Sequence, residues 1–170
     1  NDQGGTITLP NTITSIGEKA FFGFPFTTIN LPDSLEHIGY GAFAGFVHDF
    51  RISSNHPCFA VIDGSLYNKT EKELLYGYSD GRSEVVIPEG IVSIGDYAYY
   101  NRVLNKFTIP STVQKIGNYA YAGTHYNSRQ EITLPEGLLH IGDYAFANIT
   151  VTSARSFTLY LPASIQSIGE

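Results

Sequence analysis

The sequence predicts an α/β repeat fold, a right-handed solenoid of short parallel strands and short helical turns. Three recurring features carry this prediction: a proline that closes an apolar alternation, an Ile-Gly pair at a fixed distance after it, and an Ala-aromatic pair farther on. One unit of this kind cannot bury its own apolar face, so repetition at a fixed period indicates coils that stack on one another.

Each regular repeat is anchored at a Leu-Pro or Ile-Pro pair. The six anchoring prolines are Pro10, Pro32, Pro88, Pro110, Pro135 and Pro162. In every repeat an isoleucine stands at place six after the proline and a glycine at place seven. In five repeats an alanine and an aromatic residue stand at places ten and eleven. We therefore interpret each repeat as one coil of the solenoid.

The first repeat illustrates the elements in order. Ile7 and Leu9 alternate with polar residues before the proline, which predicts a strand with one buried face. Proline ends that strand because it has no N–H to donate to the next rung. Ile13 and Ile16 then predict a second extended segment across another side of the core. Gly17 predicts either a turn with positive φ or close backbone contact.

A short helical turn is predicted after the glycine. Asp96, Asn118 and Asp143 directly follow it in their repeats and are favourable N-caps. Alanine allows the next coil to approach, and the aromatic residue fills the core. Glycine or asparagine at place thirteen is the residue type expected at a left-handed C-cap.

The spacing between anchors widens after the second repeat. This interval predicts an irregular repeat with a β insertion over residues 49–82, whose hairpin lies near 55–81. Asp63-Gly64 between two apolar runs is a strong two-residue hairpin signal, and the runs that follow predict a three-stranded meander over 59–78. We expect the insertion to form part of the solenoid wall.

The pattern L-P-x-x-L-x-x-I-G-x-x-A-F resembles the BspA-like (treponemal-type) leucine-rich repeat family, and "LPDSLEHIGYGAFAG" (31–45) shows it most fully. The resemblance covers nearly the whole chain. One departure is the cysteine that family repeats often carry after the Ala-Phe pair, which is replaced by residues such as Phe24, Phe46 and Thr124. The resemblance implies a leucine-rich-repeat solenoid that is secreted or displayed at the surface of a bacterium, with an adhesive role.

Composition excludes several classes of function. The net charge is −6 and no run of Lys or Arg exceeds two residues, which argues against nucleic acid and anionic membranes as partners. No apolar stretch approaches a transmembrane length. Cys58 is the only cysteine, so disulfides within the chain and cysteine-rich zinc sites are excluded.

The length of 170 residues predicts a single domain, residues 1–170, and we expect a monomer. The last repeat stops at "SIQSIGE", before its Ala-aromatic pair, so we expect these residues to be a fragment of a longer chain.

A ladder of tyrosines provides the main candidate for binding. Tyr97, Tyr119 and Tyr144 occupy one place in three successive regular repeats, and Tyr100 and Tyr121 lie close in sequence. Tyrosine is an effective contact residue because it is amphipathic and loses little entropy when it is ordered. In the alternative interpretation the rings stack between neighbouring coils on the convex face, with their hydroxyls in water.

A second candidate surface follows the strands. The outward residues before each proline are Thr8, Asn30, Val86, Thr108, Thr133 and Tyr160, and we expect them side by side on one parallel sheet. Of these, Thr108, Thr133 and Tyr160 are candidate contact residues. The alternative is a solvated threonine face that only favours strand formation. The long loops 122–131 and 147–156 are further places for variable recognition residues.

Catalytic and metal sites have weak support. His48 and His56 flank the irregular repeat near Cys58, but no second cysteine or HxxxH spacing completes a metal or thiol site. His37 and His140 share one repeat place but lie several coils apart. No fingerprint of a nucleotide site or of a serine hydrolase is present. The sequence therefore predicts no cofactor and no metal.

We predict a non-enzymatic, surface-exposed recognition or adhesion module that binds a host or neighbouring-cell protein or glycan. One alternative is a structural spacer within a larger bacterial surface protein. A second alternative, a carbohydrate-active enzyme, requires a pocket with two carboxyl groups at catalytic spacing.

Overall fold

The computed structural model describes residues 5–45, 49–81, 83–127, 130–152 and 156–170. The strands are β1 (Gly5–Thr8), β2 (Ser15–Ile16), β3 (Phe26–Asn30), β4 (His37–Ile38), β5 (Asp49–Arg51), β6 (Phe59–Ile62), β7 (Ser65–Asn68), β8 (Glu73–Tyr76), β9 (Glu84–Val86), β10 (Ser93–Ile94), β11 (Val103–Leu104), β12 (Lys106–Thr108), β13 (Lys115–Ile116), β14 (His125–Tyr126), β15 (Gln130–Thr133), β16 (His140–Ile141), β17 (Thr150–Val151), β18 (Phe157–Tyr160) and β19 (Ser167–Ile168).

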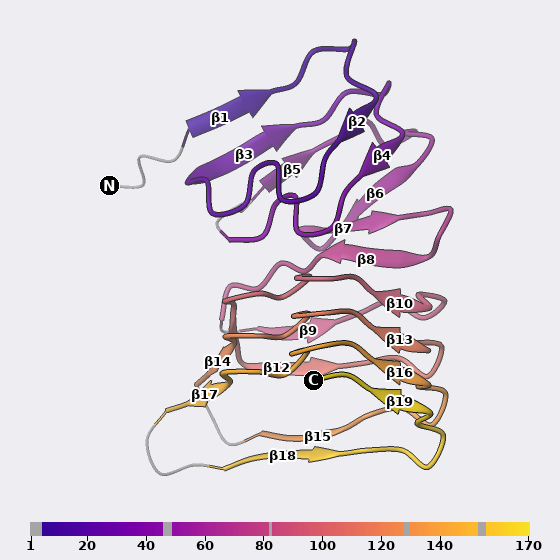
Figure 1. Ribbon diagram of the computed structural model, residues 1–170. Helices are drawn as coiled ribbons and strands as arrows, with labels where there is room; N and C mark the ends of the chain where they lie inside the picture. Colours follow the sequence, from indigo (N-terminus) through magenta and orange to yellow (C-terminus); the bar gives the residue numbers. More distant parts are fainter. Residues whose placement is uncertain (1–4, 46–48, 82, 128–129, 153–155) are drawn as a thin grey trace.

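These strands build a β-solenoid of about six coils (Figure 1). Both extended segments predicted for a repeat form strands. The segment before the proline gives β1, β3, β9, β12, β15 and β18, and the segment that ends at the Ile-Gly pair gives β2, β4, β10, β13, β16 and β19. Wherever two equivalent strands pair, they pair in parallel, as expected for stacked coils.

The second segment, rather than the strand before the proline, makes the longest sheet. The strands of this sheet lie in the order β19-β16-β13-β10-β8-β7-β6. Where strands of regular repeats are neighbours, the isoleucines of their Ile-Gly pairs lie directly opposite one another. The strands before the proline are divided among three sheets, β1-β3-β5, β9-β12 and β15-β18.

The short helical turns are the part of the predicted fold that is wrong, because the described residues contain no helix. The backbone N–H groups that follow the glycine alternate between two kinds of hydrogen bond. Those of Ala98 and Tyr100 donate to carbonyls three residues back, whereas the N–H of Tyr99 donates to the carbonyl of Ala120 in the next coil. A helix needs all of its N–H groups for its own carbonyls, so a segment that gives half of them to its neighbour forms only turns.

From the second repeat onward, place seven requires glycine because each coil nearly touches the one before it there. None of the glycines at this place has a positive φ. A Cβ built on Gly117 lies 2.3 Å from Oδ1 of Asp96, and one on Gly39 lies 2.4 Å from the backbone nitrogen of Glu18. Close backbone contact, one of the two expected reasons, therefore explains this glycine. Positive φ occurs instead at place thirteen, as expected there, at Gly23, Gly45, Asn101, Gly123 and Asn148.

The insertion contains the predicted three-stranded antiparallel meander. β6 pairs with β7, and β7 pairs with β8. β8 then pairs in parallel with β10, so the meander continues the seven-stranded sheet.

The meander strands lie between β4 and β10 (Figure 1) and contribute side chains to both hydrophobic clusters. Side chains alternate along a strand, so Leu66 joins the N-terminal cluster while Tyr67 joins the C-terminal one. Tyr76 and Leu74 of β8 divide in the same way. Full burial of a large apolar side chain contributes about 1.5–3 kcal/mol, so this wall stabilises both halves of the solenoid.

A third wall in the C-terminal half has no counterpart in the sequence prediction. β11, β14 and β17 form a three-stranded parallel sheet. β14 and β17 belong to the segments 122–131 and 147–156, which we expected to be loops. Residues 128–129 and 153–155 of those segments lie outside the described residues. Across the described part of the chain, no helix has the length and apolar character needed to span a bilayer.

Candidate interaction surface

The tyrosine ladder is built on an unusual backbone conformation. Tyr97, Tyr119 and Tyr144 stand at place nine of their repeats with φ of 61°, 54° and 54°. The same place is filled by Lys19, with φ 54°, and by Gly41, with φ 65°. Non-glycine residues rarely adopt this left-handed conformation. It recurs here in residues that donate their N–H to the next coil, as Tyr97 does to the carbonyl of Asn118.

The three tyrosine rings stack on one another. The ring centroids of Tyr97 and Tyr119 are 5.0 Å apart with an interplanar angle of 6°, and those of Tyr119 and Tyr144 are 5.1 Å apart at 24°. The spacing is close to that between neighbouring parallel strands. Stacking covers the faces of the middle ring and leaves ring edges and hydroxyl groups toward solvent, so the stacking between coils that we considered as the alternative is present.

The stack continues onto the N-terminal half. Phe22 lies 5.8 Å from Tyr97 and 5.4 Å from Tyr100 between ring centroids, and Tyr100 lies 5.4 Å from Tyr97. Nζ of Lys19 lies 4.8 Å from the centroid of Tyr97. We call Phe22, Tyr97, Tyr100, Tyr119 and Tyr144 the tyrosine ridge.

The ridge is accessible to solvent. Phe22 is 36% exposed and Tyr144 is 42% exposed, and the other three members are half-buried. No member belongs to either hydrophobic cluster of buried residues.

A ladder of Asp and Asn side chains holds the base of the ridge. The backbone N–H of Asn118 donates to Oδ1 of Asp96 at 2.8 Å, and the N–H of Asp143 donates to Oδ1 of Asn118 at 2.7 Å. Nδ2 of Asn118 also donates to Oδ2 of Asp96 at 3.2 Å. The expectation that these residues cap helices is therefore wrong. They bind the backbone of the next coil because that coil, and not a helix, presents the free N–H.

We expect Asn118→Asp to lower the free energy of unfolding by about 1–2 kcal/mol at pH 7. The change removes the donor to Asp96 and places a third carboxylate between Asp96 and Asp143. Repulsion requires ionised carboxylates, whose ordinary pKa is about 4. The deficit relative to wild type should therefore be present at neutral pH and shrink as the pH falls below about 4, as followed by urea unfolding across that range.

Asn148→Asp is the matched control, because Asn148 is exposed and stands outside the ladder. A deficit at Asn118 that is equal at every pH would show that only the hydrogen bond was lost.

Charges around the ridge are mostly negative. The residues at place eight, directly before the ridge column, are Glu18, Tyr40, Asp96, Asn118, Asp143 and Glu170. Tyr144 donates its hydroxyl to Oε2 of Glu170 at 3.2 Å. The hydrogen bond with the Tyr97 hydroxyl raises the pKa of Lys19. The carboxylate of Glu73 raises the pKa of Tyr40, with burial and the carboxylates of Asp96 and Glu71 adding to the shift.

Of the tyrosines predicted as contact residues, Tyr121 is not on the surface. It is fully buried and stacks on Tyr99 and Phe146 at centroid distances of 5.1 and 5.3 Å. It stands at place eleven, the core aromatic position, so it offers no contact area. Burial raises the pKa of Tyr121 well above its ordinary value. Its hydroxyl has no hydrogen-bond partner among the described residues.

The strand face is less continuous than predicted. Thr8 lies opposite Asn30, Val86 opposite Thr108, and Thr133 opposite Tyr160, but each pair belongs to a different sheet. Thr108 donates its hydroxyl to Oε1 of Glu84 at 3.0 Å. Tyr160 is 50% exposed. These side chains therefore form three short patches rather than one ladder.

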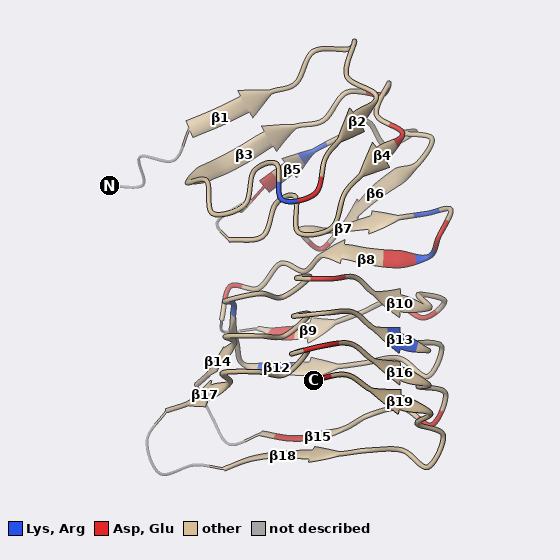
Figure 2. Cartoon of the chain, viewed as in Figure 1, with Lys and Arg blue, Asp and Glu red and all other residues tan. Residues whose placement is uncertain are grey.

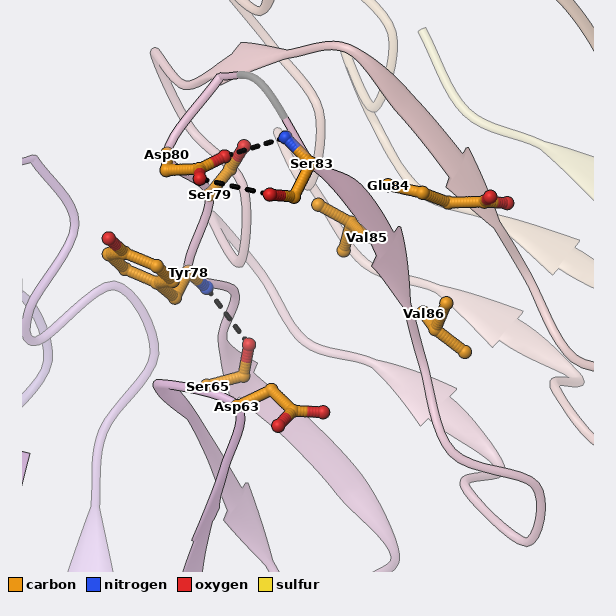
Figure 3. Close-up of a pocket in the computed structure, with 9 residues that line it drawn as sticks. All are labelled: Asp63, Ser65, Tyr78, Ser79, Asp80, Ser83, Glu84, Val85 and Val86. Carbon is orange, nitrogen blue, oxygen red and sulfur yellow. Dashed lines mark hydrogen bonds between the residues drawn. The ribbon is translucent and has the colours of Figure 1, made fainter.

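A cavity of about 310 Å³ lies where the meander meets β9 (Figure 3). Three of its lining residues are acidic: Asp63, Asp80 and Glu84. Asp80 accepts hydrogen bonds from the N–H and hydroxyl of Ser83, and Figure 3 shows the Glu84 carboxylate directed away from the other two.

The hydrogen bonds from Lys106 and Thr108 lower the pKa of Glu84. A glycosidase acid requires a raised pKa, whereas the pKa of Glu84 is lowered.

His56 has a structural role that the sequence did not reveal. It is fully buried, and its Nε2 lies 3.0 Å from the carbonyl oxygen of Pro32. Its Nδ1 accepts the N–H groups of Cys58 and Phe59, both at 3.2 Å. Both ring nitrogens are thus used, and no metal-ligating group of three side chains occurs in the part of the chain that is described. His48 lies outside the described residues.

Residues 3–72 and 73–170 match the model of the BspA type leucine rich repeat region, with six copies. No curated protein matches the sequence.

Three solved structures share the architecture. A leucine-rich repeat protein from Eubacterium ventriosum ATCC 27560 is 25% identical with a TM-score of 0.75, over 94% of this chain and 42% of that one. A leucine rich cell surface protein from Faecalibacterium prausnitzii A2-165 is 24% identical with a TM-score of 0.61, over 81% and 43%. The pneumococcal vaccine antigen PcpA is 20% identical with a TM-score of 0.67, over 96% and 56%. This chain therefore spans between 42% and 56% of the length of these proteins.

Proposed function

The chain belongs to the BspA-type leucine-rich repeat family, and from this premise we propose that it is a non-enzymatic recognition or adhesion module at a bacterial surface. Solenoids suit this role because stacked coils present one large, rigid face. One structural neighbour is described as a cell surface protein and another as a vaccine antigen, and we extend a surface location to this chain as part of the proposal.

The observation that carries the proposal is the tyrosine ridge. Its aromatic side chains contact one another from the first regular repeat to the fifth, yet none belongs to the buried core. Stacking between coils explains why the rings are ordered. It does not require tyrosine at this place, because lysine and glycine fill it in the first two repeats with the same backbone conformation. Tyrosine is enriched among the residues that carry most of the binding energy of protein interfaces, and a ring that is already ordered loses little entropy on binding.

The test is a binding screen against host matrix proteins and glycans, with the wild type beside Tyr97→Ala/Tyr119→Ala/Tyr144→Ala. We expect a saturable partner whose affinity falls by about thirtyfold or more in the triple variant, which corresponds to one hot-spot contact of about 2 kcal/mol. Circular dichroism and thermal unfolding establish that the triple variant is folded.

The matched control is Thr108→Ala/Thr133→Ala/Tyr160→Ala on the strand face. Loss of binding only in this control would move the site to the strands. Absence of any saturable partner would favour the structural spacer within a larger surface protein.

A further inference from the structure

The residues at places eight and nine put carboxylates beside aromatic residues in several coils of the stack. Asp96 and Asp143 directly precede the ridge residues Tyr97 and Tyr144. Glu18 directly precedes Lys19, and Glu170 accepts a hydrogen bond from the Tyr144 hydroxyl. All four acidic residues belong to the outward corner that the Asp and Asn ladder and the tyrosine stack define. Figure 2 shows acidic segments recurring from coil to coil along the stack. Among the described residues, the cation in contact with the ridge is Lys19.

The contacts of Lys19 show that this part of the surface holds a cation. Its ammonium group lies 4.8 Å from the centroid of Tyr97 and 3.4 Å from Oε1 of Glu18. The aromatic ring and the carboxylate therefore hold one cation together, an arrangement in which both groups attract positive charge. The repeats of Tyr119 and Tyr144 offer the same kinds of group, with Asp143 and Glu170, whereas the ring contact of Lys19 is with Tyr97.

We propose that the tyrosine ridge binds an extended, lysine- or arginine-rich segment of a partner protein. This inference rests on the proposed recognition function and names the partner's chemistry. Ring faces in the middle of the stack are covered, so the ridge presents hydroxyl oxygens and carboxylates, which accept hydrogen bonds from ammonium and guanidinium groups. A neutral sugar that stacks on an aromatic face finds no uncovered face at Tyr119. A sulfated glycan meets like charge.

The experiment measures binding to three peptides of twelve residues, in which serine alternates with lysine, glutamine or glutamate, and to the neutral oligosaccharide cellohexaose. We expect the lysine peptide alone to bind, and to bind about tenfold more weakly when the salt concentration rises from 50 to 500 mM.

Asp96→Asn/Asp143→Asn should weaken binding of the lysine peptide about tenfold. The backbone bonds of the ladder are kept, because the side-chain oxygen of Asn118 already accepts such a bond, whereas the bond from Nδ2 of Asn118 to Asp96 is lost. Asn118→Asp adds a carboxylate and should strengthen binding. The control Glu89→Gln/Glu136→Gln removes the same charge from exposed residues at place one and should change affinity less than twofold.

The outcomes separate the two proposals. Binding of the glutamine peptide or cellohexaose that is abolished by Tyr97→Ala/Tyr119→Ala/Tyr144→Ala would overturn the basic partner and keep the recognition function. If Asp96→Asn/Asp143→Asn and the control Glu89→Gln/Glu136→Gln lost affinity for the lysine peptide equally, the assignment of the site to the ridge would be overturned. No binding of any peptide, together with no partner in the wider screen, would overturn both.

Discussion

Gly117→Ala is expected to lower the free energy of unfolding by about 3 kcal/mol or more. The added Cβ would lie 2.3 Å from Oδ1 of Asp96, 2.6 Å from the nitrogen of Asp96 and 2.8 Å from the carbonyl carbon of Gly95. Two of these three atoms are backbone atoms that cannot move without displacing the neighbouring coil. The loss arises from this collision and not from backbone strain, because φ of Gly117 is not positive.

Gly17→Ala is the control that isolates the collision. Gly17 stands at the same repeat place, has no positive φ, and has no atom within 4 Å of the position that an added Cβ would occupy. Alanine there should be neutral or stabilise by up to about 1 kcal/mol, because it restricts the unfolded chain. Chemical unfolding of both variants tests the prediction. Equal stability of the two variants would contradict the close approach of the coils.

The second large effect is expected at His56. Replacement by phenylalanine keeps an aromatic ring in the site but removes both hydrogen-bonding nitrogens. The carbonyl of Pro32 and the N–H groups of Cys58 and Phe59 then lose their side-chain partner in a buried site. An unsatisfied buried polar group costs about 1–3 kcal/mol, so we expect His56→Phe to lower stability by about 2–4 kcal/mol.

His37→Phe provides the matched change at an exposed histidine on β4, where an effect within about 0.5 kcal/mol is expected. Hydrogen exchange of the amides in β6, β7 and β8 locates the damage, since His56 connects the anchoring proline of the second repeat to the start of the meander. A loss of stability no greater than that of His37→Phe would show that the three backbone groups find other partners.

Local patterns in the sequence determined much of the architecture. Alternation before each proline identified one strand per coil, the apolar pair after it identified the second, and Asp63-Gly64 identified the turn of the meander. These signals depend on which side chains must be buried within a few residues, and that information is local. The repeat also revealed the column of Tyr97, Tyr119 and Tyr144, because equivalent places in stacked coils lie side by side.

Tertiary structure determined which contacts each repeat place makes with the neighbouring coils. The segment after the glycine had the caps of a helix, but hydrogen bonds to the next coil took half of its N–H groups, and turns formed instead. The same contacts turned Asp96, Asn118 and Asp143 into a ladder. The two tyrosines Tyr119 and Tyr121 differ by two places in sequence, and only the direction of the coil sends one to the surface and the other into the core.

The joining of the ridge to Phe22 and Lys19 likewise depends on packing. The partners of Tyr97 in the first repeat are more than seventy residues away in sequence, and the irregular repeat lies between them. No local pattern encodes such a contact. The sequence by itself therefore determined the period, the strands and the column of Tyr97, Tyr119 and Tyr144. Only the stacked coils decided their exposure, their neighbours and the charge around them, because those properties arise where one coil meets another.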